Sequence, residues 1–134
     1  MKRYIITGIL LLIVAVIGAC TQQQQEPTQD NYTDISPSEA KKLIDENPDL
    51  VIIDVSPHYA QGHLPGAVHY YLGDGSLDEA IPTLDKSKTY LVYCHVDSVA
   101  RRGAQALVDA GFQNVYRLEG NYSAWVDASY PIEK

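Results

Sequence analysis

The stretch that decides the fold is Tyr90-Leu91-Val92-Tyr93-Cys94-His95-Val96-Asp97-Ser98-Val99, which runs directly into the helix-like segment Ala100–Ala110. Its apolar first half predicts a buried strand, and the polar residues after Cys94 predict a short loop. A strand–loop–helix turn directs several backbone N–H groups and a helix N-terminus at one point. A thiol at that point is expected to have a lowered pKa, because the positive potential stabilises its thiolate. We therefore predict that Cys94 is a nucleophile; a buried structural cysteine is the alternative.

Strands and helices alternate along the chain around this stretch. Ser36-Pro37-Ser38-Glu39 is a capping box with proline at the first helical position, and the helix that it opens is expected to end at Asn47-Pro48. The other predicted elements are strands over Val51–Val55, Ala67–Tyr71, Tyr90–Tyr93 and Val115–Leu118, a short helix opened by a second capping box at Ser76–Glu79, and a last helix over Asn121–Ala128. This alternation predicts an α/β fold with an open, mostly parallel sheet and helices on both faces. Ligand sites of such sheets lie outside the carboxyl ends of the strands, where Asp54 and Cys94 would both lie.

The N-terminal segment has the pattern of an export signal. Lys2 and Arg3 precede a largely apolar run from Tyr4 to Ile17, which is shorter than the roughly 20 residues of a membrane-spanning helix. Ile17-Gly18-Ala19-Cys20 follows, and it resembles the lipobox of bacterial lipoproteins, in which cleavage before the cysteine leaves that cysteine lipidated. We expect residues 1–19 to be a signal peptide and Cys20 to be the lipidation site; an uncleaved anchor is the alternative. Both place the rest of the chain outside the cytoplasm, tethered to the membrane.

Lipidation of Cys20 would limit the possible roles of Cys94. If Cys20 carries lipid, Cys94 has no partner for a disulfide within the mature chain, which favours a chemical role for it. Residues 20–31 are rich in glutamine and predict a flexible linker, whereas residues 32–134 are enough for one domain. The net charge of −7 argues against nucleic acid as a partner, so the lipid would supply the membrane affinity. We expect a monomer.

Residues 32–134 resemble a rhodanese (sulfurtransferase) domain. The resemblance lies in Val51–Val55 with Gly62–Ala67, in Leu91–Cys94 with the helix that ends at Ala110-Gly111-Phe112, and in Asn114–Gly120 with Ala124-Trp125. It implies a single open α/β domain in which Cys94 is the nucleophile. It also implies an active-site loop of six residues, Cys94, His95, Val96, Asp97, Ser98 and Val99, whereas the related dual-specificity phosphatases have a longer loop.

The resemblance implies sulfur transfer through a persulfide on Cys94. A small sulfur-containing donor would supply the sulfur, and a thiol or a cyanide-type acceptor would remove it, with the loop N–H groups stabilising the anion. This chemistry requires no metal or organic cofactor, and the spacings of the histidines and Cys94 match no zinc pattern. Asp54 would orient the loop or cap a turn, and Arg101 would lie nearby as a supporting residue in the first helical turn. His95 would supply partial positive charge, move a proton, or remain an exposed loop residue.

Three departures from the family pattern alter the charge at the site. Val99 stands where thiosulfate-using members have Arg or Lys, Asp97 occupies a position that is often Gly, and Ser56 replaces a frequent Arg. A carboxylate at Asp97 would repel an anionic donor and raise the pKa of the thiol. We therefore predict a sulfurtransferase that is weak on thiosulfate. The alternative is a non-catalytic rhodanese-like module that binds a partner or senses oxidants through its thiol, which the absent loop Arg favours.

Overall fold

The computed structural model describes residues 31–134. Its elements are β1 (Thr33–Ile35), α1 (Pro37–Glu46), β2 (Val51–Asp54), β3 (Val68–His69), α2 (Ser76–Ala80), β4 (Thr89–Tyr93), α3 (Asp97–Asp109), β5 (Asn114–Leu118) and α4 (Asn121–Asp127). Short 3₁₀ helices cover Tyr59–Gln61, Leu72–Asp74 and Ile81–Thr83. The predicted signal peptide, the lipidation site Cys20 and nearly all of the linker lie outside the described residues.

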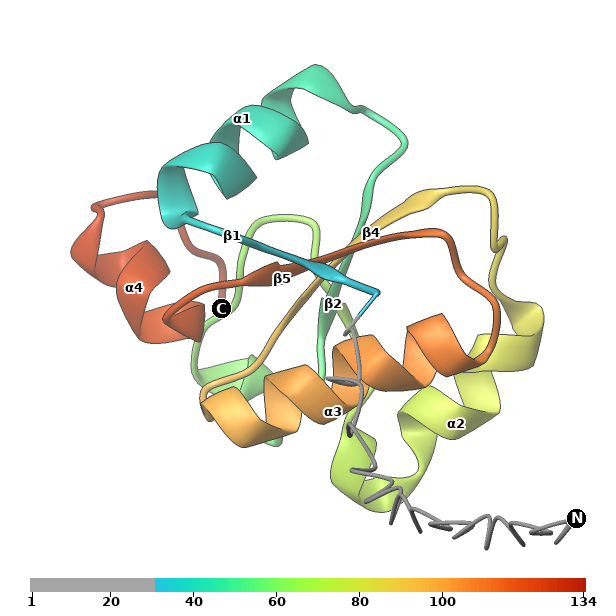
Figure 1. Cartoon of the computed structure of the whole chain (residues 1–134). Coiled ribbons are helices and arrows are strands. Elements are labelled where there is room, and N and C mark those ends of the chain that lie inside the picture. Colours follow the sequence, from blue (N-terminus) through green and yellow to red (C-terminus); the bar gives the residue numbers. More distant parts are fainter. Residues whose placement is uncertain (1–30) are drawn as a thin grey trace, which may run out of the picture.

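The five strands form one sheet in the order β1-β5-β4-β2-β3, and all of its strand pairs are parallel. Helices α1 and α4 cover one face of this sheet, and α2 and α3 cover the other (Figure 1). The predicted α/β class and the open parallel sheet are therefore confirmed. Strand β4 lies in the centre, and its apolar residues Tyr90, Leu91, Val92 and Tyr93 are buried in the cores on both faces, as their continuous run predicted.

The first capping box forms as predicted. The Ser36 hydroxyl accepts a hydrogen bond of 3.2 Å from the Glu39 N–H, and the Glu39 carboxylate accepts one of 2.8 Å from the Ser36 N–H. The helix then ends at Glu46, with Asn47 as its C-cap. Local sequence fixes this helix because both of its ends have side chains that satisfy free backbone groups.

Three local predictions differ from the structure. The second capping box does not form: Gly75 is the N-cap of α2, and the Ser76 N–H bonds the Asp74 carboxylate at 2.9 Å instead. Strand β3 is only two residues long because the chain turns into a 3₁₀ helix at Leu72. Helix α3 begins at Asp97, three residues before the predicted start at Ala100, and the Ala100 N–H already donates to the Val96 carbonyl at 3.1 Å.

Strand β1 was not predicted. It is three residues long, and only Ile35 in it is buried, so it has too short a pattern to read. Its backbone pairs with β5, from Thr33 opposite Tyr116 to Ile35 opposite Leu118. In residues 31–134, no helix is both long and apolar enough to span a bilayer.

Candidate active site

Cys94 and Asp54 lie at the carboxyl ends of neighbouring strands. Asp54 is the last residue of β2 and stands opposite Tyr93, the last residue of β4, and the Val55 N–H donates to the Tyr93 carbonyl at 3.0 Å. Cys94 follows immediately. The two residues therefore lie at the edge of the sheet where the α/β topology predicted a site.

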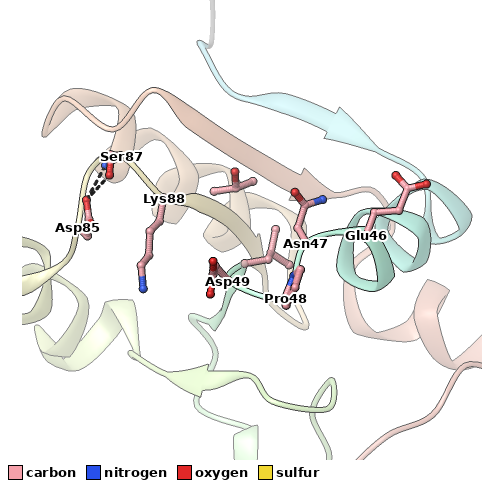
Figure 2. Close-up of a pocket in the computed structure, with 9 residues that line it drawn as sticks. Glu46, Asn47, Pro48, Asp49, Asp85, Ser87 and Lys88 are labelled. Carbon is pink, nitrogen blue, oxygen red and sulfur yellow. Dashed lines mark hydrogen bonds between the residues drawn. The ribbon is translucent and has the colours of Figure 1, made fainter.

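A hollow of about 420 Å³ lies at the opposite edge of the sheet (Figure 2). It is lined by residues 46–50 before β2 and by Asp85, Ser87, Lys88 and Thr89 before and at the start of β4. None of the predicted site residues lines it. The candidate active site is thus at the carboxyl ends of β2 and β4, and this hollow is at their amino ends.

Cys94 is a free, buried cysteine, with 1% of its surface exposed. Burial raises the pKa of its thiol, while the backbone N–H groups of Val96 and His95 lower it and the Asp54 carboxylate raises it further. The net shift is upward, so the predicted lowering of the Cys94 pKa is wrong in direction. The N–H groups expected from the strand–loop–helix turn are present, but desolvation of the thiolate outweighs them.

The active-site loop is shorter than its six predicted residues. Because α3 begins at Asp97, Asp97, Ser98 and Val99 form its first turn, and only His95 and Val96 lie between Cys94 and the helix. Val96 is 52% exposed, whereas Val99 is half-buried and packs against the core between the sheet, α2 and α3. Arg101 lies in the second helical turn rather than the first.

The Asp97 carboxylate is engaged by three side chains. Its Oδ2 accepts a 2.8 Å hydrogen bond from Arg101 Nε, and its Oδ1 accepts from Arg117 and, at 3.2 Å, from Asn121 Nδ2. These contacts, with the Arg101 hydrogen bond foremost, lower the pKa of Asp97, and Asp97 in turn raises the pKa of Arg101. The prediction that Asp97 raises the pKa of the thiol is wrong, because its charge is compensated; the carboxylate that raises it is Asp54.

Arg117 and Asn121 were not predicted as site residues. Arg117, in β5, is 2% exposed and donates from Nε to Asp34 of β1 at 2.7 Å, in addition to its bond with Asp97. Asn121 opens α4, is 3% exposed, and accepts a 3.2 Å bond from the Cys94 N–H. Two signals could have identified them: an arginine inside an apolar strand needs buried partners, and a Gly-Asn pair tolerates positive φ.

Asp54 caps the turn that follows β2. The residue is fully buried, and its Oδ1 accepts a 2.8 Å hydrogen bond from the Ser56 N–H. Its Oδ2 is buried and has no hydrogen-bond partner among the described residues. Of the two predicted roles, turn capping is therefore the one observed.

His95 lies in a half-buried aromatic setting. Its ring stacks on Tyr122 of α4 with centroids 4.3 Å apart, and the His58 ring lies 5.3 Å away. Burial lowers the pKa of His95; Asp54 opposes this shift, and His58 adds to it. The Nε2 atom is buried and has no partner in the described part of the chain. The interpretation of His95 as an exposed loop residue is therefore wrong, because its ring is half-buried against Tyr122.

His63 and Trp125 make contacts that stabilise the fold. His63 stacks on Tyr59 at 3.7 Å, bonds the Tyr59 carbonyl at 3.0 Å and lies 3.5 Å from the Glu133 carboxylate, so it holds the turn as predicted. Trp125 is buried and donates to the Pro131 carbonyl at 2.8 Å. Across residues 31–134, no group of three or more His, Cys, Asp or Glu side chains could hold a metal ion.

Comparison with known proteins agrees with this geometry. Residues 36–128 match the sequence model of the rhodanese-like domain. A protein from Coxiella burnetii named thiosulfate sulfurtransferase GlpE is 38% identical over 96 residues, which cover 70% of this chain and 87% of that protein. The solution structure of the rhodanese-like domain of the Alr3790 protein from Anabaena superposes with a TM-score of 0.67 at 29% identity, covering 75% of this chain and 77% of that one. A polysulfide-sulfur transferase homodimer from Wolinella succinogenes superposes with a TM-score of 0.64 at 27% identity, covering 77% and 79%.

Proposed function

This chain belongs to the rhodanese-like domain family, and from that premise we propose that it is a sulfurtransferase that carries sulfane sulfur as a persulfide on Cys94. The relative from Coxiella burnetii is named for sulfur transfer from thiosulfate, and the Wolinella succinogenes structure for sulfur transfer from polysulfide. Both names support the reaction type for this chain, and the residues around Cys94 support a particular form of it.

The reaction proceeds by two displacements at sulfur. The Cys94 thiolate attacks the outer sulfur of the donor, a new S–S bond forms, and the donor's inner sulfur leaves with the electron pair of the broken bond. An acceptor thiolate or cyanide then attacks the outer sulfur of the persulfide, and the Cys94 thiolate leaves. Each step exchanges one bond for another, so no oxidant or reductant is consumed.

The observation that carries this proposal is the place of Cys94 directly after β4 and just before α3, where the backbone N–H groups of Val96 and His95 lower the pKa of its thiol. They lie at the N-terminus of α3, where the helix dipole also favours negative charge. A persulfide places its negative charge on the outer sulfur, one atom farther from the Cys94 backbone than in the resting thiolate. The raised pKa of the resting thiol is therefore compatible with a stable persulfide anion.

The donor is expected to be less charged than thiosulfate. The two arginines beside the loop, Arg101 and Arg117, are both paired with Asp97, and Val99 is apolar. An anionic donor thus meets a site whose nearby guanidinium groups are already neutralised. An alkyl persulfide would not need a fixed cation and should be the better donor.

Turnover with the two donors tests this preference. Val99→Arg should raise thiosulfate turnover by about tenfold to somewhat over a hundred-fold, since one charge-assisted hydrogen bond contributes about 1.5–3 kcal/mol. Val99→Leu enlarges the same half-buried side chain without adding charge and is the matched control. Salt should reduce the gain from arginine. Equal turnover of thiosulfate by wild type and Val99→Arg would refute the preference.

We place the domain outside the cytoplasm, held to the membrane by lipid on Cys20 and acting as a monomer. The support is the sequence from Lys2 to Cys20, and residues 1–19 would be removed as a signal peptide. Cys20→Ala should then give a soluble exported protein or an unprocessed one, measured by fractionation and lipid labelling. Membrane retention of unlabelled Cys20→Ala would instead support an uncleaved anchor.

A second candidate is a non-catalytic module that binds a partner or senses oxidants through its thiol. The burial of Cys94 and the upward shift of its thiol pKa favour the partner-binding form of this candidate, because both lower the nucleophilicity of the resting thiol, and they disfavour oxidant sensing for the same reason. This candidate predicts that Cys94 takes no sulfur from any donor.

Mass spectrometry of the intact protein after exposure to an alkyl persulfide separates the two candidates. The sulfurtransferase should gain one sulfur atom at Cys94 and lose it when cyanide or a thiol is added. Cys94→Ser is the control, because any added sulfur that persists in that variant is not bound at Cys94. Absence of a Cys94 adduct in folded wild-type protein would reject sulfur transfer.

A further inference from the structure

The turn between β5 and α4 holds the Cys94 loop through one side chain. Asn121 Oδ1 accepts a hydrogen bond of 3.2 Å from the Cys94 N–H, and Asn121 Nδ2 donates one of 3.2 Å to Asp97 Oδ1. The chemistry fixes the orientation of this amide, because an N–H needs an acceptor and a carboxylate needs a donor. A single buried amide therefore contacts both ends of the segment that places its N–H groups at the sulfur.

The backbone of Asn121 adopts a conformation that glycine and asparagine tolerate and most other residues do not. Its φ is +57°, in the left-handed region that favours glycine, and Asn121 and Ser129 are the two non-glycine residues of the described chain with positive φ. Glycine would adopt this conformation without strain but could make neither hydrogen bond. Asparagine therefore fits this backbone and adds the two hydrogen bonds that glycine lacks.

The Asp97 end of the segment has a second support. Arg117 is buried between β1 and the start of α3, where it bonds Asp34 at 2.7 Å and also Asp97. At the Cys94 end, the Tyr122 N–H donates to the Cys94 carbonyl at 3.0 Å. Consecutive residues of the β5–α4 region thus fix both ends of the loop, and Asn121 is the member that touches both.

We propose that Asn121 is a positioning residue, which sets the geometry of the Cys94–Asp97 segment and through it the accessibility and reactivity of the thiol. Its effect on turnover rests on the proposed sulfur transfer, but its effect on the loop does not. The Cys94 N–H bond would hold the sulfur under the His95 and Val96 N–H groups. The Asp97 bond would hold the first turn of α3 against the β5–α4 turn.

Two substitutions separate these bonds. Asn121→Gly removes both and relieves the strain at φ +57°. Asn121→Asp keeps an acceptor for the Cys94 N–H but places a second carboxylate against Asp97, and its charge should raise the pKa of Cys94. Asn47 gives matched controls: it caps α1 at the amino end of the sheet, where its Nδ2 donates to the Leu43 carbonyl at 2.8 Å.

The experiment measures hydrogen exchange of the Cys94 amide and site-resolved alkylation of Cys94 against pH in the full chain. In Asn121→Gly we expect the Cys94 amide to exchange about tenfold faster, as loss of a buried hydrogen bond implies, while the amides of α1 keep their wild-type rates. Alkylation of Cys94 above its pKa should be faster and kcat for sulfur transfer lower, with little change in KM. In Asn121→Asp the Cys94 amide should stay protected, and the alkylation inflection should move to higher pH.

Specific outcomes would overturn the proposal. Wild-type exchange and alkylation in a folded Asn121→Gly protein would do so, and so would equal changes in Asn47→Gly. If Asn121→Gly does not fold, a wild-type alkylation inflection in Asn121→Asp refutes the proposal in its place. If the Asn121 variants behave as expected but wild type transfers no sulfur, the proposed function fails and the positioning role stands.

Discussion

The two sides of the Cys94 loop use their polar groups differently. On the side towards α3 and β5, Asp97 is bonded by Arg101, Arg117 and Asn121, so both of its oxygens have partners. On the side towards β2, Asp54 and His95 each keep one buried polar atom without a partner among the described residues. Buried polar atoms without partners are costly, and they persist where a ligand or water completes them. This fold therefore fixes the loop by hydrogen bonds on the side of α3 and β5 and leaves hydrogen-bonding capacity on the side of β2.

The largest expected effect comes from breaking the contacts of Asp97 on the side of the loop towards α3 and β5, which we call the held side. Arg117→Met should lower the free energy of unfolding by about 2–3 kcal/mol, because Asp34 and Asp97 lose a buried partner. The loss is smaller than that of a fully buried pair, since the Asp34 and Asp97 side chains are 30% and 52% exposed. Urea titration measures it. A loss of unfolding free energy below about 0.5 kcal/mol would mean that the ion pairs of Arg117 do not stabilise the fold.

A change on the other side of the loop, towards β2, should alter the pKa of the Cys94 thiol more than the stability of the fold. We call this side, with Asp54 and His95, the open side. The Asp54 carboxylate raises the pKa of Cys94, so Asp54→Asn should move the alkylation inflection of Cys94 to lower pH and speed alkylation a few-fold near neutrality. An asparagine oxygen can still accept the Ser56 N–H. Asp85→Asn is the matched control, because Asp85 caps Ser87 in the same way at 2.9 Å, at the other end of the sheet. Equal shifts in both variants would contradict the assignment of Asp54.

His95 should make a smaller, pH-dependent contribution. Its pKa is lowered by burial, so the unfolded chain binds its proton more tightly and stability falls as pH drops below the ordinary histidine value of about 6.5. His95→Phe keeps a ring against Tyr122 and removes this loss. Its stability relative to wild type should therefore rise as pH is lowered from about 7 to about 5, measured by thermal unfolding at each pH. Parallel curves would show that His95 titrates as it does in the unfolded chain.

The smallest expected effect is that of an ion pair outside the loop. Lys41 Nζ and Asp45 Oδ2 lie 2.6 Å apart on α1, with side chains 32% and 57% exposed. Lys41→Ala should cost about 0.3–0.5 kcal/mol, as for other exposed i,i+4 pairs. Comparison of this loss with that of Arg117→Met tests whether burial of the arginine, rather than charge pairing itself, sets how much an ion pair contributes to the free energy of unfolding. Equal losses in the two variants would remove that distinction.

The sequence predicted what depends on local pattern. The capping box at Ser36, the buried central strand and the position of Cys94 at a strand end all follow from residues a few positions apart. The Arg117–Asp34 bond joins residues 83 positions apart, and the Asn121–Cys94 bond joins residues 27 apart, so no local pattern announces either. The direction of the Cys94 pKa was missed for a related reason. The N–H groups come from the local turn, but the burial that outweighs them comes from the packed core.

The burial of Cys94 also bears on its chemical durability. Oxidation to sulfenic and then sulfinic acid begins from an accessible thiolate, and a thiol that is 1% exposed with a raised pKa offers little of it. A disulfide between two copies of the chain would need the two Cys94 sulfurs to lie about 2.05 Å apart. Because Cys94 is buried, a second copy cannot bring its sulfur that close without unfolding the loop. The packing that buries Cys94 and raises the pKa of its thiol should therefore slow oxidation of this cysteine as well as its nucleophilic attack.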